Sequence, residues 1–192
     1  MSYLLNALVL LITLAFDAVV VLFLVRLAAE AGRADFRNPL SQFVYPHPPT
    51  PVLAPIRRVL PNWRRINLAA VLVAWLLMLL KRLVLFALIG FMPHIAGLLV
   101  LALADLLDFV LMFYLILVFV WSLLSMLSND PHQPLQHLLG AIVEPLLRPL
   151  RGRLVFGMMD FGPAAAMIVL LLGRILLAAP LLDLGTRLAM GS

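Results

Sequence analysis

Six ionisable side chains lie inside long apolar runs of this sequence, where a charge is unfavourable and therefore informative. They are three acids and three bases, namely Asp17, Lys81, Arg82, Asp105, Asp108 and Arg174. A charge in the middle of a hydrocarbon layer costs about 2.5–3.5 kcal/mol on insertion scales, so each one predicts a charged partner or a function. Asp105 and Asp108 stand three residues apart, which places both on one face of a helix.

Two interpretations of these charges follow from their spacing. At 1.5 Å per residue, Lys81 and Arg174 each lie about 20 Å along their own apolar runs. In a polar pathway, acids near one end would gather cations, and the two bases would gate their passage. In a structural arrangement, the bases extend toward the interface, and Asp17 and Asp108 pair with them across helices. We favour the second, because a potassium pore would use carbonyls or acidic rings rather than a cationic centre.

The apolar runs themselves are typical of a membrane protein. Hydrophobic residues make up 65% of the 192 positions and charged residues 12%, against about half and about a quarter in soluble domains. Four runs, at about 3–25, 67–92, 95–127 and 161–182, reach the roughly 20 residues that a crossing needs. We therefore predict an all-α, polytopic transmembrane helical bundle with about four crossings. The third run exceeds that length, so one of its ends should protrude or tilt.

Two proline- and arginine-containing segments indicate an internal repeat. The stretches TPVLAPIRRVLP at 50–61 and EPLLRPLRGRL at 144–154 share the frame P-x-L-x-P-[I/L]-R. On either side of these segments, with shifts of about one residue, Asn38 aligns with Gln133, Asn67 with Asp160, and Lys81 with Arg174. The pattern predicts two units, at 1–94 and 95–192, each with a span, a basic segment and a second span. Because each unit crosses twice, the two are parallel rather than inverted.

The second proline segment predicts an amphipathic helix. Apolar residues from Leu135 to Leu150 follow i, i+3, i+4, i+7 spacing, which favours a helix in the membrane interface. Pro134 suits a first turn, whereas Pro145 should break the helix and leave a second short piece. The arginines could then contact anionic headgroups. The more ordinary interpretation, which we favour, is a rigid proline path with arginines that obey the positive-inside rule. A re-entrant loop is a third possibility.

The distribution of basic residues predicts the orientation and the partner. The connections 26–66 and 128–160 hold seven and three of the fourteen Lys and Arg residues, so both should be cytoplasmic and both termini outside. The net charge of the chain is +5, and most of its basic residues lie between the apolar spans. Anionic lipid headgroups are therefore the expected partner, rather than nucleic acid.

Motifs for catalysis or cofactors are not found in the sequence. The chain has no cysteine, which excludes disulfides, thiolate metal sites and C-x-x-C-H haem attachment. It lacks a G-x-x-x-x-G-K-[ST] loop, an H-E-x-x-H helix and a G-x-S-x-G turn. His132 and His137 are a weak ligand pattern. We expect no enzyme activity, cofactor or metal.

Combined in chain order, these motifs resemble the YggT (YlmG-like) family of bacterial inner-membrane proteins, over nearly the whole chain and in the doubled arrangement. The resemblance rests on the Asn38-Pro39-Leu40 element, the two proline–arginine segments and Asp160-Phe161-Gly162-Pro163. The candidate interface residues are those of the motifs: Asn38, Pro39, Pro51, Pro55, Arg57, Arg58, Pro134, Pro145, Pro149, Arg151, Asp160 and Pro163.

The resemblance implies an integral membrane protein without an established biochemical activity. Our leading expectation is a non-enzymatic adaptor or assembly factor that binds headgroups, a membrane partner or a second copy of itself. The alternative is a component of ion transport or of osmotic and potassium homeostasis. The resemblance also links such proteins to cytochrome assembly and to cell division.

Overall fold

The computed structural model describes residues 2–32, 38–44, 67–127, 133–150, 154–156 and 159–191. The first proline segment, with Pro51, Pro55, Arg57 and Arg58, lies outside the described residues, and so does Arg151. Helices make up nearly all of the described part, which confirms the predicted all-α class.

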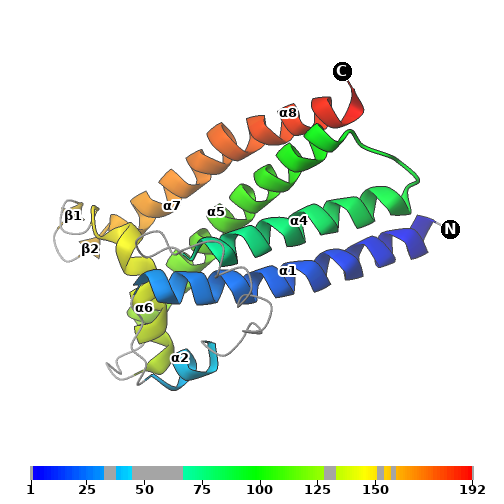
Figure 1. Cartoon of the computed structure of the whole chain (residues 1–192). Helices are drawn as coiled ribbons and strands as arrows, with labels where there is room; N and C mark the ends of the chain where they lie inside the picture. Colours follow the sequence, from blue (N-terminus) through cyan, green and yellow to red (C-terminus); the bar gives the residue numbers. More distant parts are fainter. Residues whose placement is uncertain are drawn as a thin grey trace.

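Four helices are long and apolar enough to cross a membrane, as predicted. They are α1 (Ser2–Gly32), α4 (Leu68–Leu88), α5 (Ile95–Leu127) and a fourth span in which α7 (Gly162–Gly173), a π-helical turn η1 (Arg174–Ala178) and α8 (Ala179–Met190) follow without a break. Both termini lie at the same end of the molecule (Figure 1), here called the terminal end. The two halves of the chain therefore run in parallel, span by span.

Several span ends differ from the predicted ones. The first helix continues to Gly32 and the fourth span to Met190, whereas α4 ends at Leu88. Apolar runs stop at the first polar residues, but a helix continues where those residues find partners, as Arg26 does with Glu30 one turn later. The chain leaves α4 through Gly90, whose φ of 69° lies in the left-handed region that favours glycine.

The spans pack side by side around a shared apolar core. Helix α4 contacts both α1 and α5, and α5 contacts the whole fourth span. The core joins α1, α4 and α5 through side chains such as Val20, Met78 and Phe113. Helix α5 is therefore the central element, and the fourth span depends on it for most of its contacts.

Two glycines bring α5 and α8 unusually close. A Cβ atom on Gly97 of α5 would lie 2.1 Å from the backbone nitrogen of Ala189 in α8. A Cβ on Gly185 of α8 would lie 2.9 Å from Leu101 of α5. Small residues that let helix backbones approach are typical of packing between membrane spans, because lipid tails provide no hydrophobic drive between helices.

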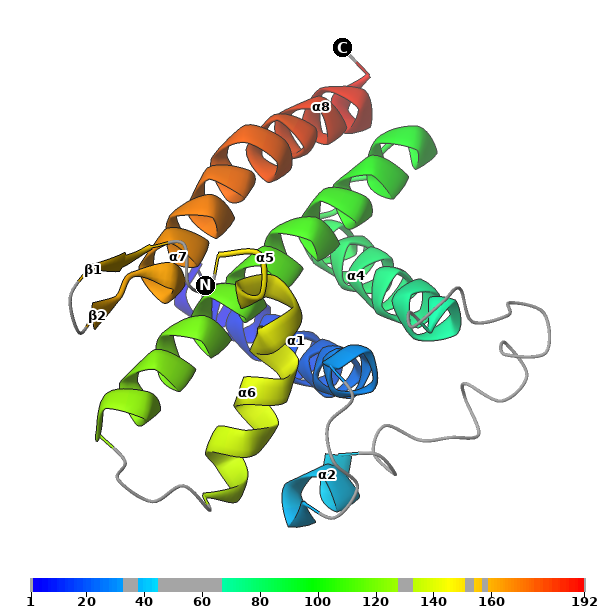
Figure 2. The same ribbon diagram turned by 90° about the vertical axis from the view of Figure 1, so that its left-hand side faces the viewer.

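Two short helices lie at the opposite end, here called the α6 end (Figure 2). Helix α2 (Pro39–Val44) contacts α6 (Pro134–Leu147), which in turn packs on α1 and α5. The apolar face of α6 is buried as its spacing predicts, with Leu138, Leu139, Ile142, Val143 and Leu147 each at most 6% exposed. The α6 end is thus covered by segments that occupy corresponding positions in the two halves of the chain.

The predicted break at Pro145 is wrong. Helix α6 continues through Pro145 to Leu147, and a turn follows at 148–150. Proline removes a single backbone donor, which in a helix would bond to the carbonyl four residues earlier. Because Pro145 lies in the last turn and on the exposed side, that loss ends the helix shortly afterwards instead of interrupting it.

A small antiparallel hairpin, which the sequence did not predict, precedes the fourth span. Strands β1 (Val155–Phe156) and β2 (Met159–Asp160) pair with Val155 opposite Asp160. The backbone nitrogen of Phe161 then donates to the carbonyl of Leu154, at 3.0 Å. The hairpin therefore directs the chain into α7.

Candidate functional site

The first of the intramembrane ion pairs lies within the first repeat. Lys81 on α4 donates from Nζ to Oδ1 of Asp17 on α1, at 2.8 Å. The lysine is only 9% exposed, and its Nζ lies 6.0 Å from the centroid of the Phe109 ring. A buried ammonium without a partner would be strongly destabilising, so this pair explains how both charges are tolerated.

The second ion pair repeats this arrangement in the second half of the chain. Arg174 donates from Nε to Oδ1 of Asp108 on α5, at 2.7 Å, and from Nη2 to Oδ2, at 3.0 Å. The residue of the second half that corresponds to Asp17, at the same separation as Pro39 and Pro134, is Met112. Its sulfur lies 3.3 Å from Nη1 of Arg174. The acid has thus moved by one helical turn, while the base keeps its repeat position.

The π-helical turn begins at Arg174 itself. Such turns are rare and occur frequently at functional sites, because they change the direction of one side chain without ending the helix. The corresponding stretch of α4, around Lys81, is ordinary α-helix. The two repeats therefore present their bases in different ways.

The third ion pair joins the two repeats. Arg82 on α4 donates from Nη2 to Oδ1 of Asp105 on α5, at 2.7 Å, and from Nε to the other carboxylate oxygen. All six charges that the sequence singled out are thereby paired. The side chains of Arg174 and Asp108 are nevertheless 32% and 31% exposed, whereas that of Lys81 is 11% exposed.

A polar cluster at the α6 end holds the start of α4. The Asn67 side chain accepts from the backbone nitrogen of Ala70, at 3.3 Å, and so caps the helix. Its amide also donates to Glu30, at 3.4 Å, and Glu30 accepts from the buried Arg26, at 3.1 Å. Asp160 has the corresponding place before α7, where it accepts from the backbone nitrogen of Gly162, at 2.8 Å.

The second repeat has no acid in the place of Glu30. In that register Trp121 replaces Arg26 and Ser125 replaces Glu30. A carboxylate is therefore tolerated at position 160, where Asp160 is exposed. At position 67, a carboxylate would lie beside that of Glu30.

We expect Asn67→Asp to lower the thermal unfolding midpoint of the detergent-solubilised protein. The change removes a donor from Glu30 and adds a second carboxylate beside it, which should cost about 1–3 kcal/mol. The matched change Asp160→Asn keeps an acceptor for the helix start and should alter stability by less than about 0.5 kcal/mol. Equal effects of the two changes would contradict this account of the cluster.

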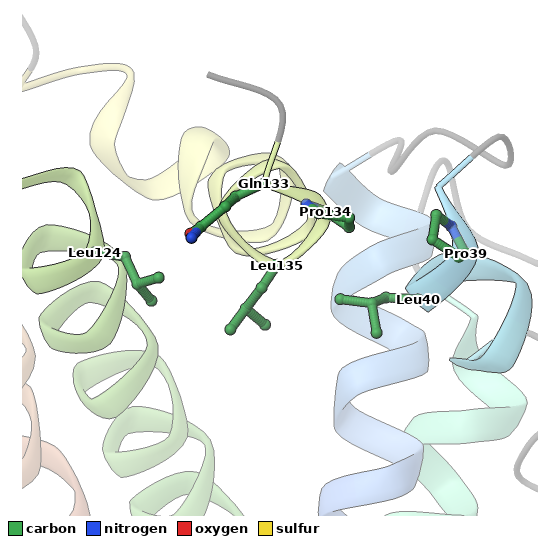
Figure 3. A pocket seen from close by; sticks show the side chains of 6 residues that line it. All are labelled: Pro39, Leu40, Leu124, Gln133, Pro134 and Leu135. Carbon is green, nitrogen blue, oxygen red and sulfur yellow. The ribbon is translucent and has the colours of Figure 1, made fainter. Parts of the chain in front are cut away.

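The α2 and α6 segments meet through motif residues. The Asn38 side chain donates from Nδ2 to the carbonyl of Pro134, at 2.6 Å, and accepts from the backbone nitrogen of Leu40, at 3.0 Å. Figure 3 shows the apolar pocket of about 400 Å³ beside this contact, lined by Pro39, Leu40, Leu124, Gln133, Pro134 and Leu135. No sequence signal pointed to the contact, because the repeat register makes the two segments equivalent without saying that they touch.

The other motif residues lie around this layer. Pro149 is exposed in the turn after α6, and Pro163 lies in the first turn of α7, where its missing N–H is harmless. Within the described ranges, no group of three or more His, Asp or Glu side chains is placed to hold a metal ion.

Fold and charges together define a polytopic helical membrane protein, built from two parallel repeats whose spans are joined by buried and half-buried ion pairs. The comparison with known families agrees with this class. The CCB3/YggT family model matches two regions, residues 5–88 and 100–181. The chain belongs to this family.

Relatives from several bacteria match most of the chain. An Escherichia coli K12 relative, "Uncharacterized protein YggT", is 34% identical over 168 residues, which are 86% of each chain. A Vibrio alginolyticus relative is 34% identical over 150 residues, 76% of this chain and 79% of its own. A Haemophilus influenzae relative is 30% identical over 143 residues, 74% of this chain and 75% of its own. No solved structure matches this chain.

Proposed function

We propose that this chain is a non-enzymatic adaptor of the bacterial inner membrane, which binds anionic headgroups or a membrane partner through the layer formed by α2 and α6. The observation that carries the proposal is the contact of these two helices across the α6 end, with Asn38 bonded to the Pro134 carbonyl. A layer of this kind provides a binding surface rather than an enclosed active site.

The composition of the layer supports the proposal. The buried side of α6 is apolar, whereas Glu144, Arg148 and Pro149 are exposed on the other side. Arg148 directly follows α6, and a basic side chain near an anionic leaflet favours contact with the headgroups. The basic residues of both connections adjoin this layer in sequence, so we assign the α6 end to the cytoplasmic leaflet.

The alternative role in ion transport has weaker support. The charges inside the spans that could serve an ion are bonded to one another in the described structure, two of the pairs through two hydrogen bonds each. An ion pathway would need some of these groups to exchange partners. An adaptor needs them only as fixed braces between spans.

The proposal predicts a preference for anionic lipid that depends on the α6 end. The protein would be placed in nanodiscs with equal phosphatidylglycerol and phosphatidylcholine, and the lipids retained on it counted by native mass spectrometry. Because each basic residue near an anionic leaflet contributes about 1 kcal/mol, Arg148→Gln with Arg151→Gln should lower the preference roughly tenfold or more.

Arg187→Gln is the control, since Arg187 lies near the terminal end. Because one base is removed at that end instead of two, it should lower the preference by a smaller factor than the double change does. Equal retention of the two lipids by the unaltered protein, or equal losses in the two variants, would overturn the proposal.

A further inference from the structure

The Arg174–Asp108 pair lies on an open side of α5, deep within the spans. Arg174 is about 18 Å along the helix from Gly162 and about 24 Å from Met190, in a hydrocarbon layer about 30 Å thick. Lipid phosphates lie outside that layer, so none is within ordinary reach of this site. About a third of each side chain is nevertheless exposed.

The hydrogen bonding of Arg174 is incomplete. A guanidinium has five N–H donors. Arg174 uses two of its nitrogens on Asp108 and a third on the sulfur of Met112, which is a weak acceptor. Two donors therefore have no partner within the described part of the chain, and Asp108 keeps free lone pairs. In hydrocarbon such groups require a polar protein partner or a cavity that holds water.

The patch is self-complementary. It offers a guanidinium and a carboxylate side by side, and hence both the donor and the acceptor that it needs. In a two-fold dimer the same patch of the two copies meets. Arg174 of one copy can therefore bond to Asp108 of the other copy while it keeps the bond to Asp108 of its own chain. A second copy of this chain therefore satisfies both groups at once.

The same side of α5 continues as an exposed apolar stripe. It consists of Met112, Ile116, Phe119 and Leu123, each between 38% and 49% exposed. Their spacing of four, three and four residues is that of a seam between parallel helices. A two-fold axis along the membrane normal leaves two copies of α5 parallel, as this seam requires.

We propose that this chain forms a two-fold homodimer through the side of α5 that carries Asp108, with reciprocal Arg174–Asp108 bonds and a seam of Met112, Ile116, Phe119 and Leu123. The dimer encloses the exposed ion pair between two protein surfaces. It leaves the α2–α6 layer of each copy open.

Cross-linking tests the seam directly, since the chain has no cysteine of its own. The full-length variant Ile116→Cys would be oxidised in native membranes with copper phenanthroline. Leu103→Cys is the matched control, because Leu103 lies on the opposite side of α5 with a similar exposure of 51% against 47%. We expect a disulfide-linked dimer at position 116, in at least fivefold excess over position 103.

Subunit counting provides a second test that needs no altered seam. Fluorescently tagged wild-type protein in vesicles at low density should bleach in two steps, and Asp108→Asn should raise the single-step fraction severalfold. Single-step bleaching of the wild type would overturn the proposal and leave water or lipid as the cover of the ion pair. Equal cross-linking at positions 116 and 103, or a product whose mass includes another protein, would also overturn it.

Discussion

Replacing Asp17 with alanine should destabilise the protein by about 3 kcal/mol or more. The change leaves the Lys81 ammonium buried without the carboxylate that lies 2.8 Å away. Breaking a buried pair by removing one partner typically costs 3–5 kcal/mol, because the remaining charge loses its compensation. The free energy of unfolding would be measured by titrating purified protein in mixed micelles with a denaturing detergent.

The double variant Asp17→Ala/Lys81→Met separates the loss of a pair from the loss of a side chain. Removing both charges should recover most of the stability, since an apolar pair suits a membrane interior. Asp183→Ala is the control, because Asp183 is exposed in α8 and should matter by less than about 0.5 kcal/mol. A single variant as stable as the wild type, or a double variant as unstable as the single one, would contradict this role.

Replacing Gly97 with alanine should separate α5 from α8 and lower the thermal unfolding midpoint. The added carbon would lie 2.1 Å from the nitrogen of Ala189 and 2.4 Å from its Cα, and the backbone cannot yield as a side chain can. Overpacking of this kind costs about 1–3 kcal/mol. The better helix propensity of alanine, worth up to about 1 kcal/mol, offsets part of that cost.

Gly173→Ala is the same chemical change at a permissive place. Its Cβ would lie 3.5 Å from Leu111, an ordinary van der Waals distance. This variant should be as stable as the wild type or slightly more stable. If Gly97→Ala behaves in the same way, the close approach of α5 and α8 is not a feature of the folded protein.

The architecture could be predicted from the sequence because it depends on local patterns. Long apolar runs indicate spans, and the spacing of Leu138, Ile142 and Val143 indicates the face that α6 buries. The repeat register placed Lys81 and Arg174 at equivalent positions. The family assignment, made on the proline–arginine motifs, is confirmed.

The sequence predicted that Asp17 and Asp108 pair with bases across helices, but which base each acid meets could not be predicted from local patterns. The repeat register points from Arg174 to Met112, but its carboxylate partner is Asp108, one turn away. This displacement of the acid by one helical turn cannot be read from the composition of α5, because it depends on the position of the fourth span along the α5 axis. The close packing at Gly97 could not be predicted either. A lone glycine in an apolar run is required only when another backbone lies against it, as that of Ala189 does here.

The bond between Arg82 and Asp105 has a consequence for the assembly of the chain during synthesis. Asp17 and Lys81 can pair as soon as the first two spans are in the membrane, but Arg82 finds its acid only when α5 arrives. The first half of the molecule is therefore left with an uncompensated guanidinium until the second half is inserted. Although the chain consists of two repeats, the first repeat depends on the second for the partner of Arg82, and expressing the first half alone would leave this guanidinium in the bilayer without its carboxylate.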